Sequence, residues 1–439
     1  MMRKFLYSSV VLGLCATGAN AFDYKVSGSA ESFTKAGFNN QKLNEETGAT
    51  PTDSFTTIFG QLNINAELVP GLKAGLGGAI GGLAFDSTRS GSDPVTGSVN
   101  QDSYFGMAND RGKVQNYIVH NAFAEYSYND NFYIKAGRYE SGKVGEWFSG
   151  YTQGAEGYLQ FSGVKVWGFL SNRRAFAYDQ WFNDFYRVNG QYDSSKATRN
   201  IYAAGLDYTT GGLSLSAFSY IVPGKVVAPG ASITFDTNPS FEAQGFHSVT
   251  KIRTLFPMAQ GDFREGKANN INAGSTYRDW GKIENQTATL YIEQKFELDN
   301  FNFGAGYYQN FGNANGLIGT WGNPLMLDFW TATSYDFGRA LSDMVGANAI
   351  TGFGFFGAKY GGFDWKIIGR GTTSDRSDEQ SVALYLNYQI REDIAIGGKL
   401  EWLNDTTKKG YHAYLGGVEL KENRTYDRSH AFFYIRHTF

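Results

Sequence analysis

Residues Ser381–Leu400 read SVALYLNYQIREDIAIGGKL, and apolar side chains recur at every second position on both sides of a polar triplet, Arg391-Glu392-Asp393. Successive side chains of an extended strand point to opposite faces, so this alternation is typical of a strand with one apolar and one polar face. The apolar face consists of Val382, Leu384, Leu386, Tyr388 and Ile390 before the triplet, and of Ile394, Ile396, Gly398 and Leu400 after it. Two such runs around a short turn predict an antiparallel hairpin.

The same hairpin pattern occurs at two other places in the chain. In Thr57–Ile80 the turn is Val69-Pro70-Gly71, and in Thr287–Tyr308 it is Asp299-Asn300. The positions between the apolar residues are polar or small in both hairpins. A soluble sandwich also alternates, because one face of each sheet is packed and the other is wet. Alternation alone therefore leaves a soluble sandwich and a membrane barrel open.

The lengths of the connections favour the membrane barrel. The sequence predicts tight turns at 69–71, 128–131, 162–163, 209–212, 299–300, 361–362 and 391–393, and long polar stretches near 34–53, 86–116, 141–154, 172–199, 222–285, 311–346, 371–380 and 404–428. Short periplasmic turns and long extracellular loops are the construction of bacterial outer-membrane barrels. Aromatic residues also gather near strand ends, where amphipathic rings form girdles at the headgroup level: Tyr126, Tyr128, Phe132, Tyr133, Tyr307, Tyr308 and Trp402.

The number of strands stays open between sixteen and eighteen on periodicity alone. Sixteen strands can be read if both chain ends lie on the short-turn side. The stretch 222–285 is long for a connection without structure, and a further hairpin around Phe241–Arg253 makes eighteen. The fold class is therefore all-β, a transmembrane antiparallel barrel.

The two chain ends fit an exported barrel. Residues 1–21 combine two basic residues, an apolar run and the small-residue site Ala19-Asn20-Ala21, which predicts a cleaved signal peptide and a mature barrel domain over 22–439. The rival interpretation is lipidation of Cys15, although Leu14 is large for a lipobox. At the other end, HAFFYIRHTF places Phe433, Ile435 and Phe439 on one face, and we expect this strand to pair with the first strand near Phe22–Phe33.

Composition excludes several other classes of protein. The single cysteine lies inside the predicted signal, so the mature chain has no thiol for a disulfide, a thiolate metal site or cysteine catalysis. After residue 21 no run approaches the ~18 apolar residues of a membrane helix, and the mean hydropathy is −0.36. No fixed-period repeat indicates a solenoid or propeller. The formal charge of −3 gives no reason to expect nucleic-acid binding.

A barrel of this size is too wide for its own side chains to fill, so we expect a water-filled pore. The best candidate for a constriction is Lys135–Phe161, which is rich in glycine and carries charges of both signs. In this interpretation the loop folds inward and places a transverse field across the pore, from Lys135, Arg138, Glu140, Lys143, Glu146 and Glu156. The alternative is an ordinary external loop whose charges are solvated.

Further charges are expected at the mouth and along the wall of the pore. Arg173 and Arg174 open the next long connection and are either a basic rung at the mouth or a solvated pair. Strand parity places these charges in the lumen, provided that no register slips by one residue: Lys73, Glu125, Glu293, Lys295, Lys399, Glu401 and Arg436.

Signals for catalysis are weak, and we predict neither an enzyme nor a cofactor. The five histidines show no metal-ligand spacing, and no GxSxG motif occurs. The glycine run Gly75–Gly82 lacks the GK[ST] ending of a phosphate loop and lies within a strand. A barrel adhesin, which binds host surfaces through its long loops, is the alternative to a porin.

Three stretches resemble one family of outer-membrane porins: FDYKVSGSAESF at 22–33, KAGRYE at 135–140 followed by GYTQGAEG at 150–157, and the aromatic terminal strand. The resemblance is to epsilon-proteobacterial porins of the Helicobacter Hof type, which are similar to the OprD type of substrate-specific porin. It implies eighteen strands, a third external loop that narrows the pore, and a partly basic lumen. By the same resemblance Lys135, Arg138 and 141–156 form the constriction, and amino acids or peptides are the cargo.

The expected setting follows from these observations. The cell outer membrane supplies lipid and lipopolysaccharide as partners, the barrel-assembly machinery recognises the C-terminal strand, and small hydrophilic solutes and ions pass through the pore. His437 departs from the usual assembly signal, which has a bulky apolar residue at that position. Trimers are common among porins, which leaves a homotrimer open.

Overall fold

The computed structural model describes residues 23–41, 44, 52, 54–86, 116–141, 150–175, 182, 184–185, 200–261, 264, 284–314, 346–412 and 419–439. The proposed signal peptide lies outside these residues. Within them, no helix is long and apolar enough to cross a membrane.

The described residues form twenty strands in one sheet. The strands of the first half are β1 (Asp23–Gly37), β2 (Phe55–Val69), β3 (Leu72–Asp86), β4 (Tyr117–Tyr128), β5 (Phe132–Glu140), β6 (Tyr151–Phe161), β7 (Val164–Ala175), β8 (Ile201–Thr210), β9 (Leu213–Val222) and β10 (Val226–Asp236). Those of the second half are β11 (Phe246–Leu255), β12 (Met258–Ala259), β13 (Ala288–Leu298), β14 (Phe301–Phe311), β15 (Ile350–Tyr360), β16 (Phe363–Thr373), β17 (Ser377–Arg391), β18 (Ile394–Thr407), β19 (Arg424–Asp427) and β20 (His430–Thr438).

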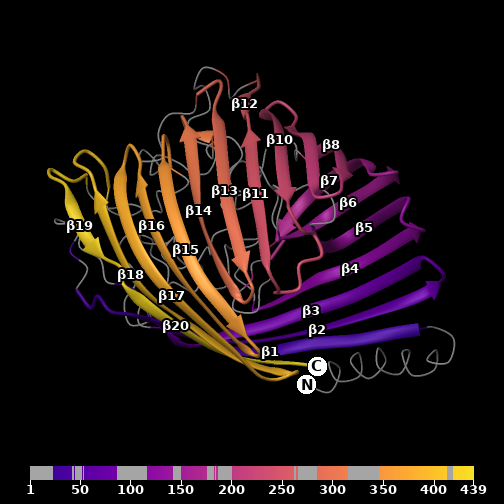
Figure 1. Cartoon of the computed structure of the whole chain (residues 1–439), viewed down its shortest axis with the longest axis horizontal. Coiled ribbons are helices and arrows are strands. Elements are labelled where there is room, and N and C mark those ends of the chain that lie inside the picture. Colours follow the sequence, from indigo (N-terminus) through magenta and orange to yellow (C-terminus); the bar gives the residue numbers. More distant parts are fainter. Residues whose placement is uncertain are drawn as a thin grey trace, which may run out of the picture.

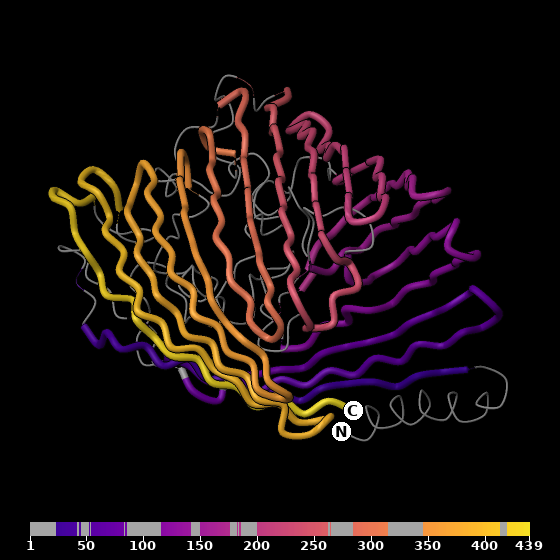
Figure 2. The backbone as a smooth tube through the Cα atoms, in the orientation of Figure 1, coloured from indigo at the N-terminus to yellow at the C-terminus, as the bar shows by residue number. Residues whose placement is uncertain are grey.

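The sheet is a closed antiparallel barrel. Each long strand pairs with the next along the chain, and β1 pairs with both β2 and β20. In Figures 1 and 2 the first and last strands accordingly lie side by side, indigo beside yellow. The short strands β12 and β19 only extend the pairing at one end, with two and four residues. The remaining eighteen of the described strands form the wall, which confirms the larger of the two predicted numbers.

The two additional strands come from the stretch 222–285, where a hidden hairpin was expected around Phe241–Arg253. The hairpin is β10 and β11, which begins fifteen residues earlier than that range, at Val226. Pro229 and Gly230 lie inside β10 and hide its alternation, yet Ala228 and Ala231 still pair with β9 on either side of them. Pro229 keeps a useful acceptor, because its carbonyl oxygen accepts a hydrogen bond from Phe256 N at 2.8 Å.

The predicted tight turns are confirmed, but two further predicted long stretches are longer than the connections in the structure. The stretch 141–154 ends early, because β6 already begins at Tyr151, so Glu156 is a strand residue and not a loop residue. The stretch 371–380 is reduced to residues 374–376 between β16 and β17. Both segments read as loops because they are rich in glycine or polar residues, which a strand at the rim of a barrel accommodates.

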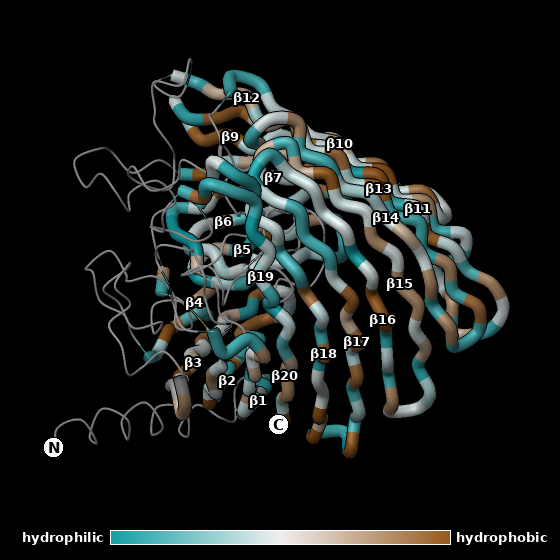
Figure 3. Tube along the Cα trace, turned by 90° about the vertical axis from the view of Figure 1, so that its left-hand side faces the viewer, coloured by the Kyte–Doolittle hydropathy of each residue, from teal (hydrophilic) through white to brown (hydrophobic). Residues whose placement is uncertain are grey.

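The wall has an apolar outer face and a buried inner face. On β2, Ile58 is 59% exposed and its neighbour Phe59 only 3%; on β20, Phe433 is 55% exposed and Phe432 only 7%. Hydrophobic and hydrophilic residues alternate along β16, β17 and β18 in Figure 3. Large exposed apolar side chains in such a continuous band suit contact with lipid. The predicted faces of the terminal strand, with Phe433, Ile435 and Phe439 outward, are therefore confirmed.

Phe439 closes the seam between β1 and β20 at the short-turn end of the barrel. Its backbone exchanges two hydrogen bonds with Gly28, Gly28 N to Phe439 O at 2.9 Å and Phe439 N to Gly28 O at 3.1 Å. A Cβ on Gly28 would lie 2.5 Å from the Phe439 ring and 2.5 Å from the backbone oxygen of Gln61. The absence of a side chain at position 28 is what lets the terminal ring lie across the seam.

His437 has a partner at the same rim. Its Nε2 lies 3.2 Å from Asp393 Oδ2, in the turn between β17 and β18. The pKa of Asp393 is held below its ordinary value, because the Arg391 side chain hydrogen-bonds to it and His437 adds a smaller contribution. The polar residue in the terminal strand thus joins an exposed ion-pair group beyond the apolar band.

We predict that Gly28→Val impairs closure of the barrel. The new side chain meets both the Phe439 ring and backbone on β2, so the fraction of chain that reaches the folded form should fall by about tenfold or more. The measurement is the yield of SDS-resistant, heat-modifiable barrel after refolding into lipid vesicles. Gly352→Val is the matched control, because a Cβ at Gly352 has no atom within 4 Å. Equal yields of the two variants, or a normal yield after deletion of Phe439, contradict this role of the terminus.

Candidate functional site: the lumen of the barrel

The charged side chains of the lumen fall into two groups by depth. Toward the end that carries the long connections they are buried: the side chains of Lys399 and Glu401 are 2% and 0% exposed. Toward the short-turn end they stay accessible: Lys295 and Glu297 are 35% and 22% exposed. The lumen is therefore packed in its long-connection half and has a water-accessible vestibule in its short-turn half.

A buried polar group lies where β17, β18 and β20 meet. Lys399 Nζ is 2.7 Å from Glu401 Oε2, and Ser381 donates a hydrogen bond to the other carboxylate oxygen at 2.5 Å. His430, directly opposite Glu401 in the β18–β20 register, brings Nε2 to 3.3 Å from the same carboxylate. The Lys399 ammonium also lies 4.2 Å from the centre of the Phe432 ring. The Lys399 and Glu401 charges therefore have the opposite charge and the hydrogen bonds that buried ionic groups require.

The same stretch of wall holds further ion pairs that sequence reasoning missed. Arg370 Nη1 lies 2.6 Å from Glu379 Oε2 across β16 and β17, and Arg428 Nη2 lies 2.7 Å from Asp405 Oδ2. Strand parity could have indicated Asp405, which lies four residues beyond Glu401 on the same face. Arg370 directly precedes the stretch 371–380 that was predicted as a long connection, although β16 continues to Thr373.

Across the seam, Arg436 Nε lies 2.5 Å from Glu31 Oε2. The two residues are direct partners in the β1–β20 register, and Glu31 is buried. Glu31 was also missed, although it shares the face of Ser29 and Phe33 in the first strand.

Lys135 belongs to a second charged group, on β4, β5 and β6. Its Nζ lies 3.1 Å from Glu125 Oε2 and 3.8 Å from the centre of the Phe123 ring. In register it is opposite Glu156, whose Oε1 accepts a hydrogen bond from the Tyr133 hydroxyl at 3.2 Å. The barrel thus brings Lys135 and Glu156 together through strand pairing and not through a loop.

Arg138 and Arg173 converge on a phenylalanine from the connection between β7 and β8. The Arg138 guanidinium lies 4.5 Å from the centre of the Phe185 ring, and its Nε donates to Gln153 Oε1 at 3.1 Å. Arg173 Nη1 donates to the backbone oxygen of Phe185 at 3.3 Å. Simple parity breaks down here, because Gly137 has a φ of +121° and the β6–β7 register shifts between Gln153 and Gly154.

Phe182 and Phe185 are inside the barrel. They are 0% and 2% exposed, and the Phe182 ring lies 5.8 Å from that of Phe59 on β2. Together they complete a buried hydrophobic group rich in aromatic rings, here named the seam cluster: Phe33, Phe55, Phe59, Ala79, Ile118, Tyr151, Ala175, Phe182, Phe185 and Phe432. A part of the fourth long connection therefore reaches into the lumen. The expected third-loop constriction stays a prediction, because residues 142–149, with Lys143 and Glu146, lie outside the described residues.

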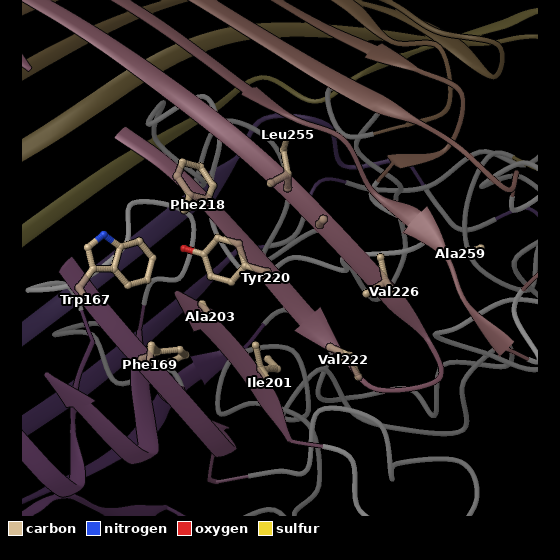
Figure 4. Packing of buried hydrophobic residues seen from close by; sticks show 11 residues of the cluster. Trp167, Phe169, Ile201, Ala203, Phe218, Tyr220, Val222, Val226, Leu255 and Ala259 are labelled. Carbon is tan, nitrogen blue, oxygen red and sulfur yellow. The ribbon is translucent and has the colours of Figure 1, made fainter. Parts of the chain in front are cut away.

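A second apolar group covers the inner face of β7 to β11. Figure 4 shows the rings of Trp167, Phe218 and Tyr220 gathered there. The Phe218 and Tyr220 rings lie 5.7 Å apart with their planes at 77°, an edge-to-face arrangement. Trp167 Nε1 donates to Asp207 Oδ1 at 3.1 Å, and Lys165 Nζ lies 2.8 Å from Asp207 Oδ2. This sector of the lumen is apolar toward the long connections and charged toward the short turns.

The other predicted pore residues are spread around the wall. Glu293 lies 3.9 Å from Lys251 and accepts a hydrogen bond from the Tyr291 hydroxyl at 2.8 Å, and Lys295 lies 2.9 Å from Glu297. Glu140 ends β5, and Arg174 is buried at the end of β7. The residues therefore form no single catalytic cluster but a lining. Within the described part of the chain, no group of three or more His, Cys, Asp or Glu residues is placed to hold a metal ion.

We predict that Lys399→Met destabilises the barrel by about 3–5 kcal/mol, because it leaves the buried Glu401 carboxylate without its ammonium partner. The measurement is urea unfolding in lipid vesicles. The double variant Lys399→Met/Glu401→Gln should recover most of the loss. Lys295→Met is the matched control in an accessible pair, with an expected change of about 0–1 kcal/mol. If Lys399→Met and Lys295→Met lower the free energy of unfolding equally, the long-connection half of the lumen is not packed more closely than the short-turn half.

Solved barrels share this architecture over nearly the whole chain. OccK9 (OpdG) of Pseudomonas aeruginosa is 11% identical with a TM-score of 0.65, covering 95% of this chain and 98% of its own. OccAB4 of Acinetobacter baumannii is 10% identical with a TM-score of 0.63, over 95% and 98%. OprD of Pseudomonas aeruginosa is 9% identical with a TM-score of 0.56, over 95% of both chains. At such identities the likeness establishes the fold.

A comparison with curated proteins finds no match. A family model described as "Putative outer membrane protein" matches residues 9–439, which is nearly the full length of the sequence. This match agrees with the apolar outer band and the closed eighteen-stranded wall. The chain therefore belongs to this family of outer-membrane proteins.

Proposed function

We propose that the protein is a porin, a water-filled channel for ions and small hydrophilic solutes across the outer membrane. The observation that carries this proposal is the vestibule, where charged pairs such as Lys165–Asp207 and Lys295–Glu297 remain accessible inside a closed barrel. Such charges serve a lumen that holds water, because an isolated apolar interior would exclude them. The shared architecture with OprD and the Occ proteins supports the same function. We place the short turns on the periplasmic side.

The channel is narrowest in its long-connection half. Phe182 and Phe185 occupy the lumen there, and we propose that the third connection, residues 141–150, lies beside them and adds Lys143 and Glu146 to the constriction. Support comes from Arg138, which reaches Phe185 from the strand that leads into this connection. Arg138, Arg173 and Arg174 then form the basic side of the opening. Basic and acidic groups at one constriction suit zwitterionic solutes such as amino acids and short peptides.

We expect the purified protein to give stable, ohmic conductance steps in planar lipid bilayers. A water-filled lumen predicts ion flux without turnover of any substrate, whereas a barrel adhesin predicts strong binding to host surfaces and little flux. Phe185→Ala should raise the step size, because it removes a ring from the narrow part of the lumen. Phe161→Ala is the control, since Phe161 is 62% exposed on the outside of the wall. If correctly folded protein gives no conductance steps in the bilayer, the porin proposal is wrong.

The charges at the constriction should set ion selectivity. Arg138→Ala is expected to shift the reversal potential in a salt gradient toward cations, because it removes a fixed positive charge, and Glu146→Ala is expected to shift it toward anions. Arg391→Ala is the control, because Arg391 is 63% exposed and lies at the short-turn end of the barrel, away from the constriction. If neither variant at positions 138 and 146 alters conductance or selectivity, the proposed constriction is wrong while the porin proposal stands.

A further inference from the structure

The seam between β1 and β20 is the joint on which closure of the barrel depends. The two strands are in register from Ser29–Thr438 to Gly37–His430, which is nine pairs, within the range of the other neighbouring strands. The seam joins the first and the last described strands, so, unlike the hairpins of the wall, it has no turn that connects its strands. Opening of this joint exposes two unpaired strand edges to lipid, where each free backbone group costs several kcal/mol.

Aromatic rings cover this seam on the luminal side. Phe33 of β1 and Phe432 of β20 lie 5.1 Å apart across the joint, and Phe33 also lies 5.9 Å from Phe55 of β2. These three residues are buried members of the seam cluster. The cluster thus depends on both terminal strands being in place.

Phe182 and Phe185 connect the seam cluster to strands β5 and β7. Phe182 packs on Phe59 of β2, and Phe185 is fixed by Arg138 of β5 and Arg173 of β7. Asp184 Oδ1 accepts a hydrogen bond from the Phe185 backbone N–H at 2.7 Å. Phe185 is therefore anchored on β5 and β7, and Phe182 packs against β2 within the seam cluster.

We propose that Phe182 and Phe185 form a strap that locks the β1–β20 seam from inside the lumen. The two rings belong to the same buried cluster as Phe33 of β1 and Phe432 of β20, and Phe182 packs directly on β2. The apolar surface of this cluster is fully buried when the seam is closed, so the free energy of that burial stabilises the closed seam. The strap docks after closure and raises the free energy needed to open the joint. This role is independent of which solute passes through the channel.

The rival explanation is ordinary core packing, in which Phe182 and Phe185 stabilise the barrel as a whole. The two explanations differ once the seam can no longer open. Position 32 faces position 435 in the β1–β20 register, so Ser32→Cys/Ile435→Cys provides a disulfide across the seam. Leu206→Cys/Ala217→Cys provides a matched disulfide across β8 and β9. Both are made in a Cys15→Ser background, because Cys15 is the only cysteine of the sequence.

The experiment compares Phe182→Ala and Phe185→Ala in these backgrounds, with the full-length protein in lipid vesicles. The readouts are the temperature at which SDS-resistant barrel is lost and hydrogen exchange of the strand amides. We expect both variants to lower that temperature and to speed exchange in β1 and β20 by about tenfold, with little change in β8 and β9. The seam disulfide should abolish the effect, and its reduction should restore it. The β8–β9 disulfide should leave the effect intact.

Phe218→Ala is the control for loss of a luminal ring, because Phe218 is buried in the apolar group on β7 to β11. It should destabilise the barrel equally with and without the seam disulfide. If a strap variant does not fold, Phe182→Leu keeps the position apolar and gives the same comparison with a smaller effect. An undiminished loss of stability in the seam-stapled protein, or unchanged exchange at the seam, overturns the proposal.

Discussion

Backbone hydrogen bonding in lipid is the constraint on which the rest of this structure depends. A strand that faces lipid has no water to satisfy its N–H and C=O groups, so the sheet must close on itself. The chain meets this requirement by pairing its first described strand with its last, with Phe439 bonded to Gly28 through backbone groups. The rim above the same seam is tied as well, since Asn39 and Thr52 both donate to the carbonyl oxygen of Asp427.

Closure also dictates how the interior is filled. On each strand, the apolar side chains at alternate positions face the lipid, and the side chains between them face the lumen. That half carries a number of charges unusual for a buried wall, and the structure compensates them in pairs. Lys399–Glu401 is a pair within β18, and Arg370–Glu379 is a pair across β16 and β17. Aromatic rings complete the lining, both as apolar clusters and as surfaces beneath the ammonium and guanidinium groups. In its long-connection half, the wall of the lumen is thus a second core, built from polar pairs and rings.

Alternation and turn spacing were sufficient to predict the barrel, the faces of the terminal strand and the positions of the tight turns. They failed where local composition contradicts the strand, as in β10 with Pro229 and Gly230, and in β6, where glycines suggested a loop. The site was predicted less completely. Parity marked Lys399 and Glu401, but partners such as Glu31, 405 residues from Arg436 in the chain, depend on the closing register. The entry of Phe182 and Phe185 into the lumen depends on long-range packing. The aromatic residues on either side of them in the sequence are a signal that this stretch is buried.

The adjacency of the first and last strands makes the order of strands around the wall cyclic. Asp23 begins β1 and Phe439 follows β20 at the same end of the barrel. In a variant without residues 1–22, a short linker can therefore join these two positions, and new chain ends can be opened in another tight turn, such as 361–362. Such a circular permutant keeps every pair of neighbouring strands, but the joint without a connecting turn now lies between β15 and β16. The aromatic rings over β1 and β20 then lie on a continuous hairpin, and Phe182 and Phe185, which contact β2, β5 and β7, no longer lie beside the joint. If these rings lock the seam as proposed, the position of the joint around the circumference sets which part of the barrel opens first.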